Sequence, residues 1–470
     1  MKSLGGDIMK KLLGWVGFLF LLLGTTIPAF SAEIVNTPNL TLNLGGRFQL
    51  LGELEGIIPG AAIRNFNRIY LFNSEDRLFA NGNYNDVQFY FETAMGGEAL
   101  NSSNNQINLL EFNASVPIHD TTLIVTAGQF KVPVNLESAD YDGNMLFAEK
   151  SPLMQLFFNT GYDTGIALRG TSGNFDALIG TISGAPDLPQ RYLPEIMKFP
   201  PMVMARIGYS DGIAYHPFHP KQMGFKMPKK SAFAIHLNGE YINDSNAGHA
   251  TDLALQNGYS SVADYNSYYG NALLNSAFNP FLGKTAAGFG PVDATYWQTS
   301  VDLQYRAPLD GTVFTLQAQA NVAKFSARNF TPVIIQNGTT TTGNIGVEGA
   351  EIQASVGNNP WIVAGRFAVV DPSNSLMTSV VSGGVTMMVQ ATGTEPIYEV
   401  TFPSITWNIN SSTKIIAEGM GLIDTPVINS NDGTYIMTEM PSEISAGINT
   451  SAIHRASFIP VGRMMFQFSF

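Results

Sequence analysis

Arginine is the residue type with the clearest chemical potential in this sequence. In four segments the alternation of side chains can be read, and there Arg47, Arg306, Arg366 and Arg463 stand among polar residues, opposite the apolar and aromatic ones. A guanidinium is permanently charged and carries five N–H donors, so each of these arginines places a fixed positive charge on the polar face of its segment. The chemistry predicted from these residues is electrostatic rather than catalytic.

The histidines give little support for an enzyme. Six are scattered along the chain, and His236 is the one that stands clearly on a polar strand face. A hydrolase needs a nucleophile beside such a histidine, and no GxSxG motif occurs. His216 and His219 have the spacing of helical metal ligands, but Pro217 and Pro220 disfavour a helix and the chain has no cysteine. We therefore predict no enzyme activity, no metal and no cofactor.

The charge of the chain restricts its partners. There are 25 lysines and arginines against 37 aspartates and glutamates, a formal net charge of −12. An acidic chain is a poor nucleic-acid binder, so no nucleic-acid partner is expected. One basic run, residues 216–230, has two interpretations: an anion-collecting vestibule, or a solvated turn or loop facing lipid headgroups.

The N-terminal residues resemble an export signal. Lys10 and Lys11 precede an apolar run over 12–24, and the small residues that follow predict cleavage after Ser31 or Ala32. The run is shorter than the roughly 20 residues that span a bilayer. We therefore predict a signal peptide over 1–31, with translation starting at Met1 or Met9. An exported chain without cysteine suits the bacterial envelope.

Side chains alternate in type with a period of two along most of the remaining chain. Near residue 300, Trp297, Val301 and Leu303 share one face, while Gln298 and Asp302 share the other. The same alternation occurs at 41–50, 87–95, 232–241, 314–322 and 361–370. Each segment therefore has one apolar face and one wet face, with Glu92, Glu111 and Asp302 on wet faces.

Either a β-sandwich or a barrel that spans a membrane can show this alternation. Three features favour the barrel. The segments are about ten residues long, which is the length of a tilted membrane-crossing strand; aromatic residues stand at segment ends; and the polar faces include bulky charged groups, which suits a water-filled lumen. Only 13% of residues are charged, with a mean hydropathy of +0.06, which suits a surface that faces lipid on one side and water on the other. We predict an all-β fold, a transmembrane antiparallel barrel of about 16 strands over 32–470, with long loops near 243–295, 326–350 and 371–395.

One stretch carries a more specific signal, "TAGQFKVPVNLESADYDGNMLFAEKSPLMQLFFNTGYDTGIALRG", residues 126–170. It resembles the central signature of the phosphate-selective porin O and P family of bacterial outer membranes. The matching positions are Gly128-Gln129-Phe130-Lys131, Pro133, Leu136-Glu137, Phe147, Glu149, Ser151 and Gly165–Gly170. Shorter similarities follow in the same order at 46–50, 205–209, 365–371, 405–419 and 462–470.

The resemblance implies a trimeric 16-stranded porin in the outer membrane, surrounded by lipid, that passes small hydrophilic solutes or ions. It also implies a loop that folds inward and narrows the pore, which by position lies in 137–160. The expected pore-lining, anion-guiding residues are Arg47, Lys131, Arg169, Arg206, Arg366 and Arg463 from the matching motifs, with Arg306 added from strand parity. The expected constriction residues are Glu137, Asp140, Asp142, Glu149 and Lys150.

Phosphate selectivity does not follow from the resemblance, because the expected constriction is mainly acidic. A weakly selective or cation-tolerant pore fits these residues as well. We therefore keep two hypotheses: passive diffusion of hydrophilic solutes, anions such as phosphate among them, and a surface structural or adhesive barrel whose long loops bind a partner while its lumen is closed.

The last ten residues, "VGRMMFQFSF", predict the strand that closes the barrel. Its apolar face is Met464, Phe466, Phe468 and Phe470, expected toward lipid; its other face is Arg463, Met465, Gln467 and Ser469, expected toward the lumen. If this strand pairs with the first one, around residues 42–50, we expect Arg463 and Arg47 to be neighbours on one wall.

Overall fold

The computed structural model describes the barrel wall and part of its interior. The described residues are 32–55, 68–74, 76–95, 107–136, 146–158, 161–182, 202–213, 230–244, 294–327, 344–371, 377–382, 385–390, 396–430, 433–436 and 453–470. The expected signal peptide and most of the 243–295 loop lie outside them. No helix in these ranges is long and apolar enough to cross a membrane.

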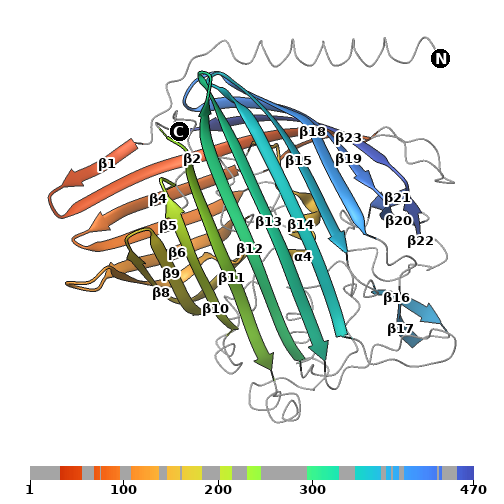
Figure 1. The fold of residues 1–470 in the computed structure, drawn as a ribbon, viewed down its shortest axis with the longest axis horizontal. Coiled ribbons are helices and arrows are strands. Elements are labelled where there is room, and N and C mark those ends of the chain that lie inside the picture. The colour runs from red at the N-terminus through yellow and green to blue at the C-terminus, as the bar shows by residue number, and fades with distance from the viewer. Residues whose placement is uncertain are drawn as a thin grey trace.

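Almost all the regular structure is antiparallel β-sheet (Figure 1). The first half of the chain forms β1 (Ala32–Thr37), β2 (Leu40–Glu55), β3 (Arg68–Asn73), β4 (Asp76–Tyr84), β5 (Val87–Met95), β6 (Asn108–Pro117), β7 (Leu123–Lys131), β8 (Tyr162–Ser172), β9 (Phe175–Ile182), β10 (Met202–Asp211) and β11 (Ala232–Asp244). The second half forms β12 (Ala294–Leu309), β13 (Thr312–Ala327), β14 (Asn344–Asn358), β15 (Trp361–Asp371), β18 (Ile397–Asn408), β19 (Thr413–Ile423) and β23 (Ile459–Ser469).

These strands close into the predicted 16-stranded barrel. Each pairs with its neighbour in the chain from β4 to β15, then β15 pairs with β18, β18 with β19, and β19 with β23. The strands β3 and β4 lie end to end along β2 and share one place in the wall. The last strand, β23, pairs with β2 and closes the ring, which confirms the predicted closure.

Short hairpins lie outside the ring. One joins β16 (Met377–Ser382) to β17 (Val385–Gln390), within the segment that the sequence predicted as an irregular loop at 371–395. Another group consists of β20 (Thr425–Ser430), β21 (Gly433–Ile436) and β22 (Ile453–Ala456). The prediction of irregular structure at 377–390 was therefore wrong, because residues there pair as a local hairpin without joining the barrel.

The two rims differ, as expected for a barrel of this kind. One rim carries the described tight turns, such as the two-residue turn at Asp310 and Gly311, where φ is +41° and +79°. Positive φ at both central residues gives the turn whose twist matches a hairpin, and Asp-Gly is a favoured pair for it. The C-terminus lies at this rim too, where Gly46 and Phe470 exchange backbone hydrogen bonds of 2.9 Å. We call it the short-turn rim.

The wall is taller on one side than on the other. Strands β12 and β13 have 16 residues each, whereas β9 has 8 and β7 has 9. Figure 1 shows β12 and β13, in green, extending past the shorter β10.

Burial follows the predicted alternation. On β10, Val203 and Ile207 are exposed on the outside while Arg206 is buried on the inside. On β12, Val301 is exposed and Asp302 is buried. The predicted faces of the final strand are confirmed as well, since Arg463, Met465 and Gln467 are buried on the inside.

Candidate functional site

The candidate site is the interior of the barrel, because a segment of irregular chain lies there. We call residues 132–158 the inner segment; its described parts are a first limb, 132–136, and a second limb, 146–158, which ends in helix α4 (Pro152–Phe158). The helix contacts β14, β15 and β18 (Figure 1). Both limbs fall within or beside the loop that the sequence predicted to fold inward.

The helix begins where its sequence predicts. The Ser151 hydroxyl accepts the Met154 N–H at 3.2 Å, which is the bond of an N-cap, and Pro152 occupies the first helical position, where its missing N–H costs nothing. Eight apolar side chains in the described parts of the two limbs are almost completely buried. They are Val132, Val134, Leu136, Phe147, Ala148, Leu153, Met154 and Phe158.

Irregular backbone inside a barrel must find hydrogen-bond partners, because it has no ladder of its own. The wall supplies them to the first limb from β10 to β13. Ser300 Oγ donates to the Val134 carbonyl at 2.6 Å, and the Gln319 side chain accepts the Leu136 N–H at 3.2 Å. We call the inner faces of β10–β13 the amide wall, since half of their buried polar residues are carboxamides. They include Asn238, Gln298, Gln304, Gln317, Gln319 and Asn321.

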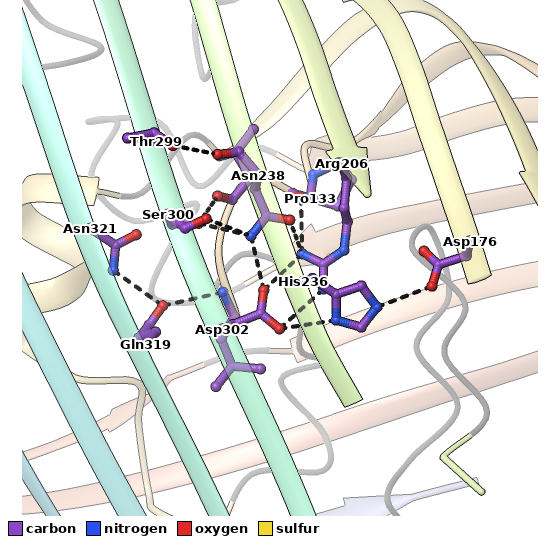
Figure 2. A network of polar contacts seen from close by, with 12 residues as sticks. Pro133, Asp176, Arg206, His236, Asn238, Thr299, Ser300, Asp302, Gln319 and Asn321 are labelled. Carbon is purple, nitrogen blue, oxygen red and sulfur yellow. Dashed lines mark hydrogen bonds and ion pairs between the residues drawn. The ribbon is translucent and has the colours of Figure 1, made fainter. Parts of the chain in front are cut away.

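One ion pair lies within the amide wall (Figure 2). Arg206 Nη1 is 3.1 Å from Asp302 Oδ2, with both side chains fully buried, and the same nitrogen donates to the Pro133 carbonyl at 3.4 Å. Asp302 also accepts from Asn238 at 2.9 Å. His236 lies between Asp302 and Asp176, 3.2 Å from each. Because both ring nitrogens face carboxylates, neither is positioned to deprotonate a serine.

The second limb is held by charged residues on β15, β18, β19, β23 and β2, whose inner faces we call the ionic wall. Arg366 Nε donates to Glu399 at 2.9 Å, and its Nη1 donates to the Glu149 carbonyl at 3.0 Å. The Arg366 guanidinium also lies 4.5 Å from the centre of the Phe147 ring. Glu399 accepts the Ser151 hydroxyl at 2.7 Å. This cluster fixes both the backbone and the side chains of the second limb.

Arg463 is the centre of the other ionic cluster. Its Nε donates to Glu53 at 2.6 Å, and its two terminal nitrogens lie 3.5 Å from Glu149 and 3.9 Å from Glu418. Glu418 in turn accepts the Ala148 N–H at 3.0 Å. Three carboxylates from separate parts of the chain thus share one buried guanidinium.

The expected contact between Arg463 and Arg47 is wrong. The strands pair as predicted, but Arg47 stands opposite Ser469 and Arg463 stands opposite Glu53. The two arginines are therefore six positions apart along the wall, about 20 Å at the rise of a β-strand. The reason is the register of the seam: parity gives the face of each residue but not the shift between the strands, and this shift places an opposite charge, Glu53, beside Arg463.

The remaining predicted residues lie along the wall. Arg47 is buried on β2, while Arg169 on β8 and Arg306 on β12 are half-buried. Lys131 ends β7 with its Nζ 5.9 Å from the centre of the Tyr162 ring. Lys150 is half-buried on the second limb. Glu137, Asp140, Asp142, His216 and His219 lie outside the described residues. No cluster of three metal-ligating side chains occurs in the described ranges.

Sequence reasoning did not single out Arg77, which belongs to another buried ion pair, nor the acids Glu53, Glu399 and Glu418 of the ionic wall. Arg77 on β4 donates to Glu92 on β5 at 2.9 Å and to the Tyr162 hydroxyl at 2.6 Å, and Tyr90 donates to Glu92 at 2.6 Å. The alternation assigned Glu92 to the wet face but did not identify Arg77. Arg77 could have been found by continuing the alternation through β4, where the apolar positions are less regular.

Comparisons with known proteins agree on the fold. The high-pH structure of Pseudomonas putida OprB covers 92% of this chain and 94% of its own, with a TM-score of 0.50 and 10% identity. The anion-selective porin from Comamonas acidovorans is 11% identical with a TM-score of 0.49, and covers 92% of this chain and all of its own. Salmonella typhi OmpF in complex with daunomycin is 9% identical with a TM-score of 0.48, covering 93% of this chain and all of its own.

No family model and no curated protein matches the sequence. Membership of the phosphate-selective porin O and P family therefore stays a prediction. The strand pairing and the likeness to OprB show a barrel with the fold of outer-membrane porins, and what the barrel does must be argued from its own residues.

Proposed function

We propose that the protein is an outer-membrane channel through which small hydrophilic solutes and ions diffuse passively. The observation that carries this proposal is the contrast between the two surfaces of the closed barrel. The outside exposes apolar residues such as Leu237 and Val301, whereas the inside is lined by polar and charged ones such as Asn238 and Asp302. A barrel with this contrast suits lipid outside and water within.

Aromatic residues support the membrane assignment. Near the short-turn rim, pairs of rings occur around the outer surface, such as Tyr209 with Phe233 at 5.6 Å and Trp361 with Trp407 at 5.5 Å. Further from this rim, Tyr241 stands opposite Trp297 and faces the same side of the sheet. Tyr241 lies eight residues along β11 from Phe233, and Trp297 lies eight residues along β12 from Tyr305. Eight residues of strand measure about 26 Å, or roughly 20 Å along the membrane normal at the usual strand tilt of about 40°, which is close to but less than the roughly 25 Å of an apolar band between two aromatic girdles.

The ion pairs of the interior support weak selectivity rather than a phosphate track. Arg206, Arg366 and Arg463 were expected to guide anions, but each is buried against at least one carboxylate. A paired guanidinium contributes little net potential to a passing ion. Its role in this proposal is to hold the inner segment, which narrows the passage. Export through a cleaved signal peptide and assembly into trimers belong to the same proposal.

A structural or adhesive barrel is the second candidate. It is favoured by the depth at which the inner segment is buried, since Val134, Leu136 and Phe158 are each at most 1% exposed. A segment packed this closely fits a closed lumen as well as a narrow one.

Recording from planar bilayers separates the two candidates. A channel gives stepwise conductance, and under a KCl gradient we expect a reversal potential near zero, because the paired charges give weak selectivity. Protein that inserts but never conducts would falsify the diffusion proposal. A strongly anion-selective reversal potential, with chloride current blocked by millimolar phosphate, would instead contradict the proposed weak selectivity.

A further inference from the structure

His236 lies between two carboxylates on the inner face of the barrel. Its side chain is completely buried, with Nδ1 3.2 Å from Asp302 Oδ1 and Nε2 3.2 Å from Asp176 Oδ1. The carboxylates come from β12 and β9, so the imidazole reaches across β10 to join strands that do not pair with each other (Figure 2). The other charged groups facing this cluster are Arg206 on β10 and Arg169 on β8, the latter beside Asp176.

The wall leaves room for the ring at a glycine. The imidazole lies against Gly208 on β10, and a Cβ at that glycine would collide with ring atoms Cδ2 and Nε2. Gly208 stands directly opposite His236 in the register. The absence of a side chain there allows the ring to lie flat against β10 and reach both carboxylates.

The number of protons on the ring decides how many carboxylates it can bind. A neutral imidazole has one N–H and one lone pair, whereas an imidazolium has two N–H groups. Only the protonated ring can therefore donate to Asp176 and Asp302 together. When the ring is neutral, its lone pair faces one of the two carboxylates and that contact becomes repulsive.

Asp302 transmits this difference to the first limb of the inner segment. It binds Arg206, which donates to the Pro133 carbonyl, and Asn238, which donates to Ser300 at 2.8 Å. Ser300 holds the Val134 carbonyl. Two short routes thus connect the carboxylate beside His236 with consecutive backbone carbonyls of the inner segment (Figure 2).

We propose that His236 is a positioning residue whose protonation tightens the attachment of the first limb to the amide wall. In the protonated state both carboxylates are fixed, and Arg206 and Asn238 keep their orientation toward Pro133 and Ser300. In the neutral state His236 loses its hydrogen bond to one of the two carboxylates, and the first limb leaves the wall more often. An imidazole titrates near neutral pH, within the range that a bacterial surface meets.

Cysteine labelling tests this directly, because the chain has no cysteine of its own. Val134 is 1% exposed, so Val134→Cys reacts with a small water-soluble methanethiosulfonate only when the first limb leaves the wall. The labelling rate of Val134→Cys is compared with that of Val134→Cys/His236→Gln at each pH, in full-length protein in lipid vesicles. The pH dependence of the thiol itself cancels in this ratio.

We expect the glutamine variant to label about fivefold faster at pH 5.5, the factor that corresponds to one lost hydrogen bond, and at nearly the same rate at pH 8. Glutamine cannot gain a second donor in acid. A ratio that does not change with pH overturns the proposal, because a purely structural histidine would give a constant factor.

Three variants keep the test decisive. His119→Gln changes a histidine that is 95% exposed at a turn, and should leave the ratio at one throughout. Met154→Cys reports on the second limb and should not respond to His236→Gln. Asp176→Asn keeps the histidine but removes one carboxylate. If the labelling rate of Val134→Cys/Asp176→Asn, relative to that of Val134→Cys, does not change with pH, the proposal is contradicted even if His236→Gln does not fold. Labelling requires no conduction, so failure of the channel function would leave this result interpretable.

Discussion

The amide wall and the ionic wall hold the two limbs of the same segment by different physical means. The amide wall uses mostly neutral groups, such as Ser300 and Gln319, each of which satisfies one backbone group of the first limb. The ionic wall uses Arg366 and Arg463, which bind side chains and backbone of the second limb together with acids of the wall. When one neutral contact of the amide wall is removed, a single hydrogen bond is lost and no charge is left without a partner. Loss of a buried arginine leaves acids facing each other.

The largest effect is expected from Arg463→Met, which tests the ionic wall at its centre. The substitution leaves Glu53, Glu149 and Glu418 close together without their shared cation. Breaking a buried pair in this way costs about 3–5 kcal/mol. We expect a lower unfolding temperature, measured by circular dichroism in detergent. The loss should shrink in acid, since protonation removes the repulsion among the carboxylates.

The control for this variant is Lys230→Ala. The Lys230 side chain is 75% exposed, and its Nζ lies 3.6 Å from Asp211. A solvated pair of this kind contributes between zero and about 1 kcal/mol. If Lys230→Ala and Arg463→Met lower the unfolding temperature equally, burial of the ionic cluster is not what stabilises the second limb.

A smaller effect is expected when both members of a pair are removed. Arg366→Met alone leaves Glu399 buried without its cation, whereas Arg366→Met/Glu399→Leu removes both charges. Buried ion pairs can often be replaced by apolar groups at little cost. The double variant should therefore unfold at a higher temperature than Arg366→Met. Additive losses would indicate that the two residues act independently.

The smallest of the three effects is expected in the amide wall. Ser300→Ala removes the donor to the Val134 carbonyl, a neutral hydrogen bond that contributes about 1 kcal/mol. Because no charge is left behind, the change in unfolding temperature should be the same at pH 5 and pH 8, in contrast to Arg463→Met. A loss as large as that of Arg463→Met would remove the distinction between the two walls.

The architecture could be predicted from sequence because its signal is local. Alternation with a period of two depends on neighbouring residues only, so it placed Arg463, Arg366 and Asp302 on the inner face correctly. The short turns and the closing strand follow from equally local patterns. The resemblance around 126–170 located the segment that the structure finds against the inner wall, although its role as a constriction stays a prediction.

The partners of the inner residues could not be predicted in the same way. Arg463 binds Glu53, which is 410 positions away, and the pairing depends on how far each strand is shifted against the next. Parity alone gives the face and leaves this shift undetermined, which is why Arg47 was assigned as the neighbour. Register could have been followed from a tight turn such as Asp310-Gly311, which sets Asp302 opposite Gln319, but no such turn joins the two ends of the chain.

The seam between β2 and β23 has a consequence for how the molecule is made. Gln49 and Gln467 bond across it at 2.8 Å although 418 positions separate them, so the ring cannot close until the final residues have been synthesised. Until then, β2 and β19 each present a row of unpaired backbone groups, which other chains can join. Such long-range pairing forms slowly. The last strand therefore converts a sheet with two reactive edges into a wall with none, and every chain must be kept from its neighbours until that step is complete.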